Sequence, residues 1–322
     1  MLETILIASP IFGIAIFGFA AARLHWVSGN NSKVLTRFVF YFAVPLFLLR
    51  KFVDSDLPDV LPLDLLASFY IPVGILYIFS LFVTAKLFRH DRSKSAITAM
   101  SSTFGNTVLL GLPVLLSTYG EDGVVPFFII LAFHGLSLFT VTTILLERAK
   151  RKNLEEFEGF PDQKPSYLRS IFQLLNSVGR NPILVAIVLG LVMNSFELKL
   201  PYTLDKIAEI MGDTVTGASL FALGATMSHY RLSGQLGAAT FIAVTKVLVL
   251  PLLAWVFGTY VFALPHSWLI ALVIFAAQPT GVSAYVFAEQ YKTGVPLSTT
   301  TVMLSTIMSM LSLPAIIYWI MQ

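Results

Sequence analysis

Two polar segments interrupt long apolar stretches of this 322-residue sequence, and their residue types suit the binding of an anion. The first reads GNTVLLGLP, from Gly105 to Pro113, and the second reads QPTGVS, from Gln278 to Ser283. Proline removes a backbone donor and clashes with the carbonyl four residues earlier, so each segment predicts a break in a helix. A helix that begins after a break points free N–H groups and a positive dipole end at one spot. Two such breaks therefore predict an anion site.

We expect the breaks at Gly111–Pro113 and at Gln278–Gly281, with Pro113 and Pro279 each beginning a second half-helix. Asn106 lies seven residues before Pro113 on the same helical face, and its amide can donate to a carboxylate. Ordinary proline kinks and an interhelical hydrogen bond are the structural alternatives. Glycines in these segments are expected to permit close backbone approach. The candidate substrate-binding residues are Asn106, Thr107, Gly111, Pro113, Gln278, Pro279, Thr280, Gly281 and Ser283.

Two ionisable side chains, Lys246 and His134, lie deep within apolar stretches. A buried ammonium group needs an anionic partner, neutralisation or water, so Lys246 is a candidate for charge compensation or proton coupling. The alternative is a tether to carbonyl groups of a broken helix, in place of a bound cation. His134 is a candidate proton relay, with an interhelical hydrogen bond as its alternative. No apolar stretch carries an evident central Asp or Glu, which weakens a carboxylate-bound sodium site but leaves one built from carbonyls and hydroxyls open.

The composition indicates a protein that lives in a bilayer. Hydrophobic residues make up 56% of the sequence, charged residues 12%, and the mean hydropathy is +0.80. The absence of cysteine excludes disulfides, a thiol nucleophile and Cys-ligated metal. Neither a cofactor nor a metal is expected. Apolar runs of helical length predict ten transmembrane spans, at residues 3–22, 34–52, 64–88, 96–119, 124–147, 181–197, 206–228, 236–262, 267–290 and 297–321.

The distribution of Lys and Arg predicts the orientation. The loops after the odd-numbered spans hold most of these residues, so both termini should face outside, with the protein in the cell (inner) membrane. Ala20–Ala22 resembles a signal-peptide cleavage site, but the only charge upstream is Glu3, so the first stretch is interpreted as a span. The net charge of +3 is small and lies in short loops, which argues against nucleic acid as a partner.

The two halves of the sequence look alike. SPIFGIAIFGF aligns with NPILVAIVLGL, matching Pro10 to Pro182 and Gly18 to Gly190. Five spans per half is an odd number, so the second half must enter the membrane from the opposite face. The predicted fold is an all-α membrane protein with ten transmembrane helices in two inverted five-helix repeats, in which broken helices four and nine cross. The predicted divisions are 1–147, a cytoplasmic linker with a short amphipathic helix at 148–180, and 181–322.

Five stretches of the sequence are distinctive: GNTVLLGLPVL (105–115), GRNPILVAIVLGL (179–191), SLFALGATMS (219–228), KVLVLP (246–251) and AAQPTGVSAYVFAEQY (276–291). They resemble motifs of the auxin efflux carrier family, which includes plant PIN-formed auxin exporters and bacterial malonate and malate permease-like proteins. The resemblance implies a scaffold domain and a transport domain built around crossed helices four and nine, and transport of organic anions by an elevator-like alternation. The long cytosolic loop of the plant exporters is absent, which favours a prokaryotic carrier and argues against auxin itself.

The rival function classes lack their motifs. The sequence has no His-Glu-x-x-His zinc pair, no Gly-x-Ser-x-Gly elbow and no mid-membrane Asp pair such as an intramembrane aspartyl protease needs, which argues against a membrane enzyme. Paired broken helices favour alternating access over a channel. The sequence thus predicts a carrier whose partners are a small organic anion and the lipid bilayer, with a homodimer as an open option. The resemblance implies that the anion is a mono- or dicarboxylate. The alternative is a sodium-coupled organic anion symporter of the bile acid symporter type.

Overall fold

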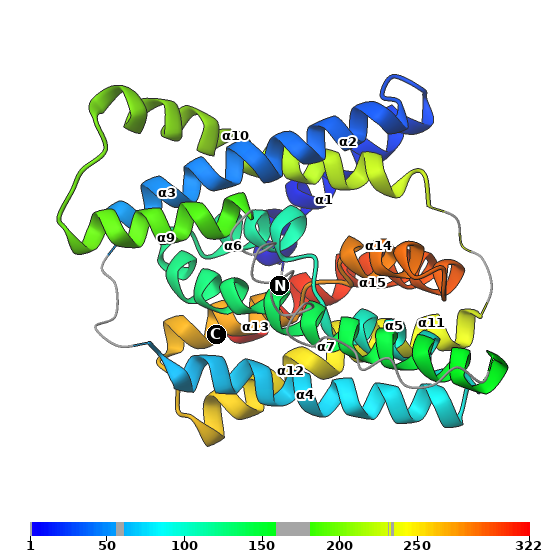
Figure 1. The fold of residues 1–322 in the computed structure, drawn as a ribbon. Coiled ribbons are helices and arrows are strands. Elements are labelled where there is room, and N and C mark those ends of the chain that lie inside the picture. Colours follow the sequence, from blue (N-terminus) through cyan, green and yellow to red (C-terminus); the bar gives the residue numbers. More distant parts are fainter. Residues whose placement is uncertain (1, 56–60, 159–180, 231, 233–234) are drawn as a thin grey trace.

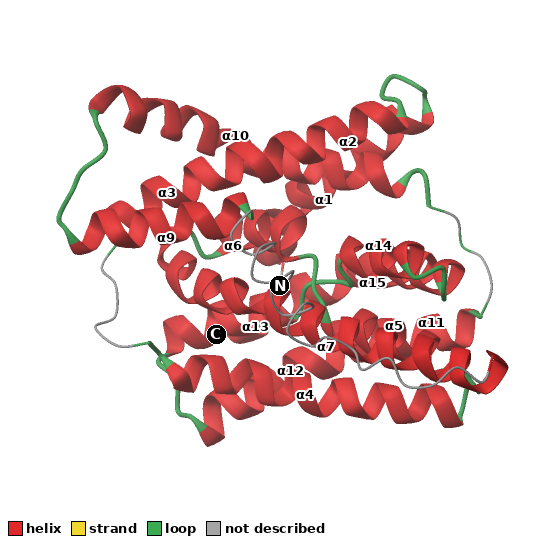
Figure 2. Ribbon diagram, in the orientation of Figure 1, coloured by secondary structure: helices red, strands yellow, loops and turns green. Residues whose placement is uncertain are grey.

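The structure is a computed structural model that describes residues 2–55, 61–158, 181–230, 232 and 235–322. Helices account for all regular secondary structure of these residues except one isolated β-bridge (Figure 2). Five helical segments are long and apolar enough to cross a membrane, and shorter apolar helices accompany them. The prediction of an all-helical membrane protein is therefore confirmed, whereas the number of crossings stays a prediction. The amphipathic helix predicted in the linker lies outside the described residues.

The helices form two layers (Figure 1). The upper layer in Figure 1 contains α1 (Leu2–Arg23), α2 (Gly29–Phe38), α3 (Val44–Asp54), α9 (Pro182–Ser195) and α10 (Tyr202–Met227). The second layer contains α4 (Leu63–Lys86), α5 (Arg92–Thr103), α6 (Leu112–Thr118), α7 (Val124–Glu158), α11 (Leu236–Val244), α12 (Leu250–Val256), α13 (His266–Ala276), α14 (Val282–Gln290) and α15 (Val295–Ile320).

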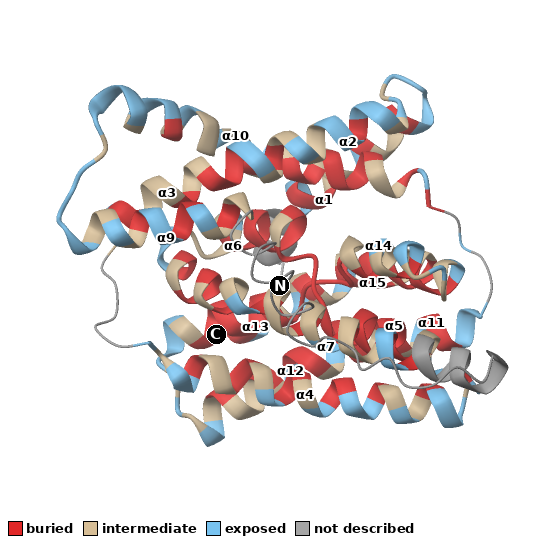
Figure 3. Cartoon of the chain, viewed as in Figure 1, coloured by how far each residue is buried: buried red, intermediate tan, exposed pale blue. Residues whose placement is uncertain are grey.

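The outer faces of the layers suit lipid. Buried residues gather where helices face one another, and exposed residues lie on the outer sides (Figure 3). In α4, Phe69 and Val73 are buried, whereas Ile78, Phe79 and Phe82 are exposed. Soluble proteins rarely expose contiguous apolar surface of this kind, so this face of α4 indicates contact with acyl chains.

Glycines bring helices of the upper layer into backbone contact. A Cβ on Gly224 of α10 would lie 1.8 Å from the carbonyl oxygen of Ala15 in α1, and one on Gly18 would lie 2.1 Å from that of Phe221. A Cβ on Gly190 of α9 would lie 2.7 Å from Cβ of Phe52 in α3. Such close crossings are stabilised in membranes by backbone packing rather than by the hydrophobic effect. Each crossing joins a helix from the first half of the chain to one from the second.

The close crossing of α1 and α10 should make the stability of the protein sensitive to a single added methyl group. Gly224→Ala should lower the free energy of unfolding by about 1–3 kcal/mol, because the helices must move apart. Gly217→Ala is the matched control, since this glycine lies in the same helix with nothing within 4 Å of an added Cβ. Thermal unfolding of the two purified variants checks the prediction. Equal melting temperatures would show that the crossing contributes nothing to stability.

Three prolines inside helices follow a π turn. In each case the proline is the second residue after the end of the turn. The turns and their prolines are Val39–Ala43 with Pro45, Thr107–Gly111 with Pro113, and Thr245–Val249 with Pro251. The residue before each proline donates its N–H to the carbonyl five residues back. This wider turn accommodates the proline ring, so the helix continues through it. The prediction that Pro113 lies at a break and begins a half-helix is therefore wrong.

Candidate functional site

Two helix breaks meet at the centre of the second layer. The first break, Phe104–Asn106, separates α5 from the π turn that leads into α6, and the second, Ala277–Gly281, separates α13 from α14. Gly105 and Thr280 form an antiparallel bridge. The N–H of Asn106 donates to the carbonyl of Pro279 at 2.8 Å, and the N–H of Gly281 donates to that of Phe104 at 2.9 Å. The backbone groups freed by each break are thus partly satisfied by the other break.

The positions of these breaks correct the sequence prediction in two ways. The first break lies at Phe104–Asn106, before the expected Gly111–Pro113, because the π turn carries the helix past Pro113. Pro279 does lie within the second break, but α14 begins at Val282 with Gly281 as its N-cap. The half-helices that follow the breaks therefore begin at Thr107 and Val282, immediately beside the bridged residues.

Side chains from neighbouring helices complete the hydrogen bonds of the bridge. The N–H of Gly105 donates to Nε2 of His134 in α7 at 3.2 Å, and the N–H of Thr280 donates to Oγ of Ser305 in α15 at 3.0 Å. The hydroxyl of Thr280 donates to the carbonyl of Ser101 at 2.8 Å. Since Nε2 of His134 accepts a hydrogen bond, it carries no proton in this arrangement. His134 therefore stabilises the first break as Ser305 stabilises the second.

Sequence reasoning missed Ser101 and Ser305. An isolated serine in an apolar helix gives no signal, because most such hydroxyls bond to the carbonyl of the preceding turn. The available signal was the likeness of the two halves, since Ser305 lies after His134 at nearly the offset that aligns Pro10 with Pro182.

Unpartnered polar atoms surround the bridged residues. Nδ2 of Asn106, Oε1 of Gln278 and Nδ1 of His134 are buried without a hydrogen-bond partner among the described residues. Asn106 is only 6% exposed, and it directly precedes the helix that begins at Thr107 without making a side-chain capping hydrogen bond. A buried polar group without a partner costs about 1–3 kcal/mol. The site therefore holds a donor on Asn106 and an acceptor on Gln278 that a ligand could satisfy.

Lys246 reaches the same place from the π turn between α11 and α12. Its side chain is 1% exposed, and Nζ donates to the carbonyl of Ala276, the last residue of α13, at 2.7 Å. Nζ also lies 3.5 Å from the position of a Cβ on Gly105. The ammonium group thus stands at the end of one half-helix and next to the bridge.

Both predicted glycines stand at close approaches. A Cβ on Gly281 would lie 2.6 Å from Cδ1 of Phe104 and 2.8 Å from the carbonyl oxygen of Gly105. A Cβ on Gly111 would lie 3.0 Å from Cγ of Gln278. The structure thus gathers all the candidates except Pro113 and Ser283 around the bridge. Pro113 lies within α6, and half-buried Ser283 lies in the first turn of α14.

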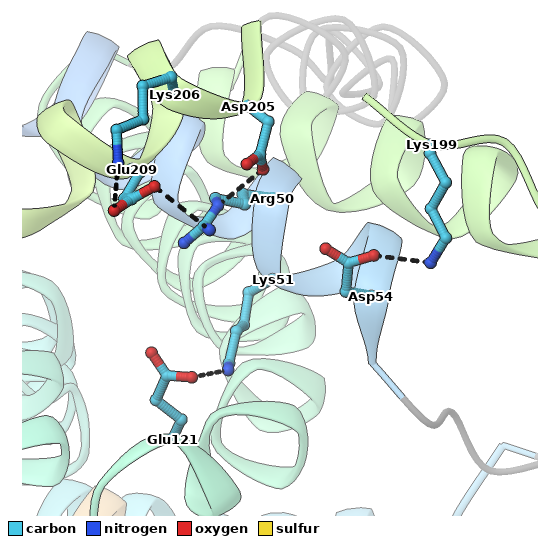
Figure 4. A network of polar contacts seen from close by, with 8 residues as sticks. All are labelled: Arg50, Lys51, Asp54, Glu121, Lys199, Asp205, Lys206 and Glu209. Carbon is cyan, nitrogen blue, oxygen red and sulfur yellow. Dashed lines mark hydrogen bonds and ion pairs between the residues drawn. The ribbon is translucent and has the colours of Figure 1, made fainter. Parts of the chain in front are cut away.

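An ion pair joins the two layers (Figure 4). Lys51 of α3 pairs with Glu121, which begins the 3₁₀ helix after α6, beside a cleft of about 430 Å³ between the layers. The remaining pairs shown lie within the upper layer: Arg50 with Asp205 at 2.7 Å and with Glu209 at 3.5 Å, Lys206 with Glu209 at 2.9 Å, and Lys199 with Asp54 at 2.8 Å. The hydrogen bond from Lys199 to Asp54 raises the pKa of Lys199 above its ordinary value.

Comparison with known proteins identifies the family of this chain. The family described as "Membrane transport protein" matches residues 5–317. A "Putative malonate transporter" of Rhizobium meliloti is 22% identical, over 97% of this chain and 94% of its own. "Auxin efflux carrier component 8" of Arabidopsis thaliana is 23% identical, over 88% of each chain. "Uncharacterized transporter YfdV" of Escherichia coli is 22% identical, over 96% of this chain and 95% of its own. The chain therefore belongs to the membrane transport protein family that includes the auxin efflux carriers, and it is a transporter rather than an enzyme.

Proposed function

We propose that this transporter carries small organic anions, mono- or dicarboxylates, by secondary-active or potential-driven alternating access. The single observation that carries the proposal is the buried, unpartnered Nδ2 of Asn106 at the meeting point of two helix breaks. The names of two relatives, which refer to malonate and to auxin, support a carboxylate as the chemical class.

The geometry around Asn106 favours negative charge. The half-helices Thr107–Thr118 and Val282–Gln290 both begin at the bridge between the breaks. The first N–H groups of a helix have no intrahelical partner, and the helix dipole adds a partial positive charge there. A carboxylate at this point would accept from Nδ2 of Asn106 and from backbone N–H groups. Substrates of carriers with broken helices bind at such termini.

The pairing of helices supports the proposal of two inverted repeats, 1–147 and 181–322, joined by the linker 148–180. Helix α1 packs on α10, and α9, the counterpart of α1, packs on α3, the counterpart of α10. The bridge is reciprocal in the same way, since each break donates one backbone N–H to a carbonyl of the other break. The proposed topology has ten crossings, both termini outside and the linker in the cytoplasm, as the Lys and Arg distribution predicts.

The two layers suit an elevator-like movement. Helices α1, α2, α3, α9 and α10 would form the scaffold, and the second layer, which contains both breaks, would carry the anion across the membrane. All polar contacts described at the bridge come from helices of the second layer. The site can therefore move as one body without breaking its own hydrogen bonds.

Replacing Asn106 tests the proposed site. Asn106→Ala should weaken the binding of a carboxylate by roughly 1.5–3 kcal/mol, the range for a charge-assisted hydrogen bond, which is about tenfold to a hundredfold in affinity. Ligand-free stability should change little, because Nδ2 has no protein partner to lose. Both quantities can be measured on the purified variant, with a thermal-shift screen of mono- and dicarboxylates to find the ligand.

Asn194→Ala is the matched control. Its Nδ2 donates to the carbonyls of Val53 and Ser55, both at 3.0 Å, far from the breaks in the sequence and within the upper layer. Losing these bonds should lower stability and leave affinity unchanged. Unchanged affinity in Asn106→Ala would remove Asn106 from the site, and a panel without any binding carboxylate would overturn the proposed function.

A further inference from the structure

Lys246 is a buried ionisable side chain without a counter-charge. Among the described residues, no other Lys or Arg and no Asp or Glu is buried, and Lys246 takes part in none of their ion pairs. An isolated ammonium group within a membrane protein is costly and is kept where it serves a function. The contacts of Nζ indicate what that function is.

Nζ of Lys246 occupies the kind of position in which carriers with broken helices hold a cation. The last carbonyls of a helix have no intrahelical partner and lie at the negative end of its dipole. In such carriers these carbonyls coordinate the coupling ion. Here the carbonyl of Ala276, at the end of α13, accepts a hydrogen bond from Nζ at 2.7 Å.

The same ammonium group lies close to the proposed anion site. Nζ of Lys246 lies 3.5 Å from the position that a Cβ on Gly105 would occupy, so it lies beside the bridge. Asn106 is the residue that follows Gly105 in the sequence. The described residues offer no cluster of three or more His, Cys, Asp or Glu that could hold a metal ion in its place. Lys246 also belongs to the second layer, so its charge would move together with the bound anion.

We propose that Lys246 is a built-in substitute for a coupling cation: its Nζ holds the carbonyl end of α13 and neutralises one negative charge of the substrate, so that binding needs no sodium. This inference rests on the proposed anion site. It decides against the sodium-coupled alternative, and it names Lys246 as the residue that sets the charge of the loaded site. A monoanion together with Lys246 forms a neutral pair.

The test uses malonate as the probe and the purified full-length chain in choline chloride or sodium chloride. Wild-type affinity should be the same in both salts. Lys246→Met keeps an unbranched side chain that is one atom shorter and removes its charge, so it should lose about tenfold to a hundredfold in affinity. Lys246→Arg restores the charge and should recover part of the affinity. The Lys246→Met variant is expected to fold, because it removes an unpaired buried charge and keeps most of the packing of the side chain.

Lys246→Ala tests the position of the cation without any anion. This variant leaves a space at the carbonyl of Ala276, so sodium or ethylammonium should raise its melting temperature while leaving that of the wild type unchanged. Wild-type affinity that requires sodium would overturn the inference, as would an Ala variant that neither cation stabilises. Wild-type protein that binds neither malonate nor any other carboxylate would overturn the proposed function, whereas the melting response of Lys246→Ala would still report on the cation position.

Discussion

A cross-link between positions 51 and 121 is expected to stop transport while leaving anion binding in detergent intact. Lys51 and Glu121 form an ion pair between the two layers, and an elevator-like movement must separate them in each cycle. The chain has no cysteine, so Lys51→Cys combined with Glu121→Cys introduces the only two thiols. Uptake of the anion into proteoliposomes that contain this double variant would be measured before and after treatment with a short bis-methanethiosulfonate cross-linker. It would be measured again after a reductant has cleaved the cross-link.

A second cysteine pair within one layer gives the matched control. Asp54 and Lys199 also form an ion pair, but both lie in the upper layer, so linking Asp54→Cys to Lys199→Cys should leave transport unchanged. The ion pair between Lys51 and Glu121 is itself exposed and contributes only about 0–1 kcal/mol, so each single variant should remain active. Full transport by the linked 51–121 protein would exclude a sliding movement between the layers at this point.

Gly281→Ala is expected to reduce anion binding and transport by more than about a hundredfold, the effect of misplacing binding groups by about 1 Å. The backbone of Gly281 has φ −73° and ψ 146°, which alanine adopts without strain, so the effect is steric. The added Cβ would lie 2.6 Å from Cδ1 of Phe104, whereas carbon atoms in contact prefer about 3.5–4.0 Å. Phe104 cannot easily move, because its ring stacks on His134 at 4.6 Å and on Phe139 at 5.0 Å. The breaks must therefore separate.

Gly74→Ala provides the control for this variant. Gly74 lies in α4 of the same layer, and nothing stands within 4 Å of an added Cβ. Affinity and uptake should match those of the wild type in Gly74→Ala. Retained affinity in Gly281→Ala would mean that the contact between the two breaks is not required for binding.

The sequence predicts what depends on local composition. Apolar runs of helical length locate the helices, since lipid exposure requires a continuous apolar surface. The sequence correctly predicts the second break at Pro279, because this break contains a proline flanked by small residues. The same argument fails at Pro113, because a π turn continues the helix past this proline. Phe104–Asn106 contains no proline and breaks because it pairs with a segment far away in the sequence.

The partners of the site residues could not be predicted for the same reason. For Lys246 the sequence left charge compensation and a tether to carbonyls open, and only the structure supplies its contact with Ala276. The ion pair between Lys51 and Glu121 depends on how two layers dock, which no local pattern encodes. Long-range contacts of this kind are specified by packing over the whole chain.

The contact between α1 and α10 also constrains how the protein is made. Gly18 meets the backbone of Phe221, so the ribosome must synthesise most of the chain before α1 finds its partner. At about 5–20 residues per second, this interval is about 10–40 s. Throughout it, the glycine face of α1 lacks its partner helix. The packing of α1 on α10 is therefore a late event in biogenesis, and a chain truncated before α10 lacks the helix that contacts α1 most extensively.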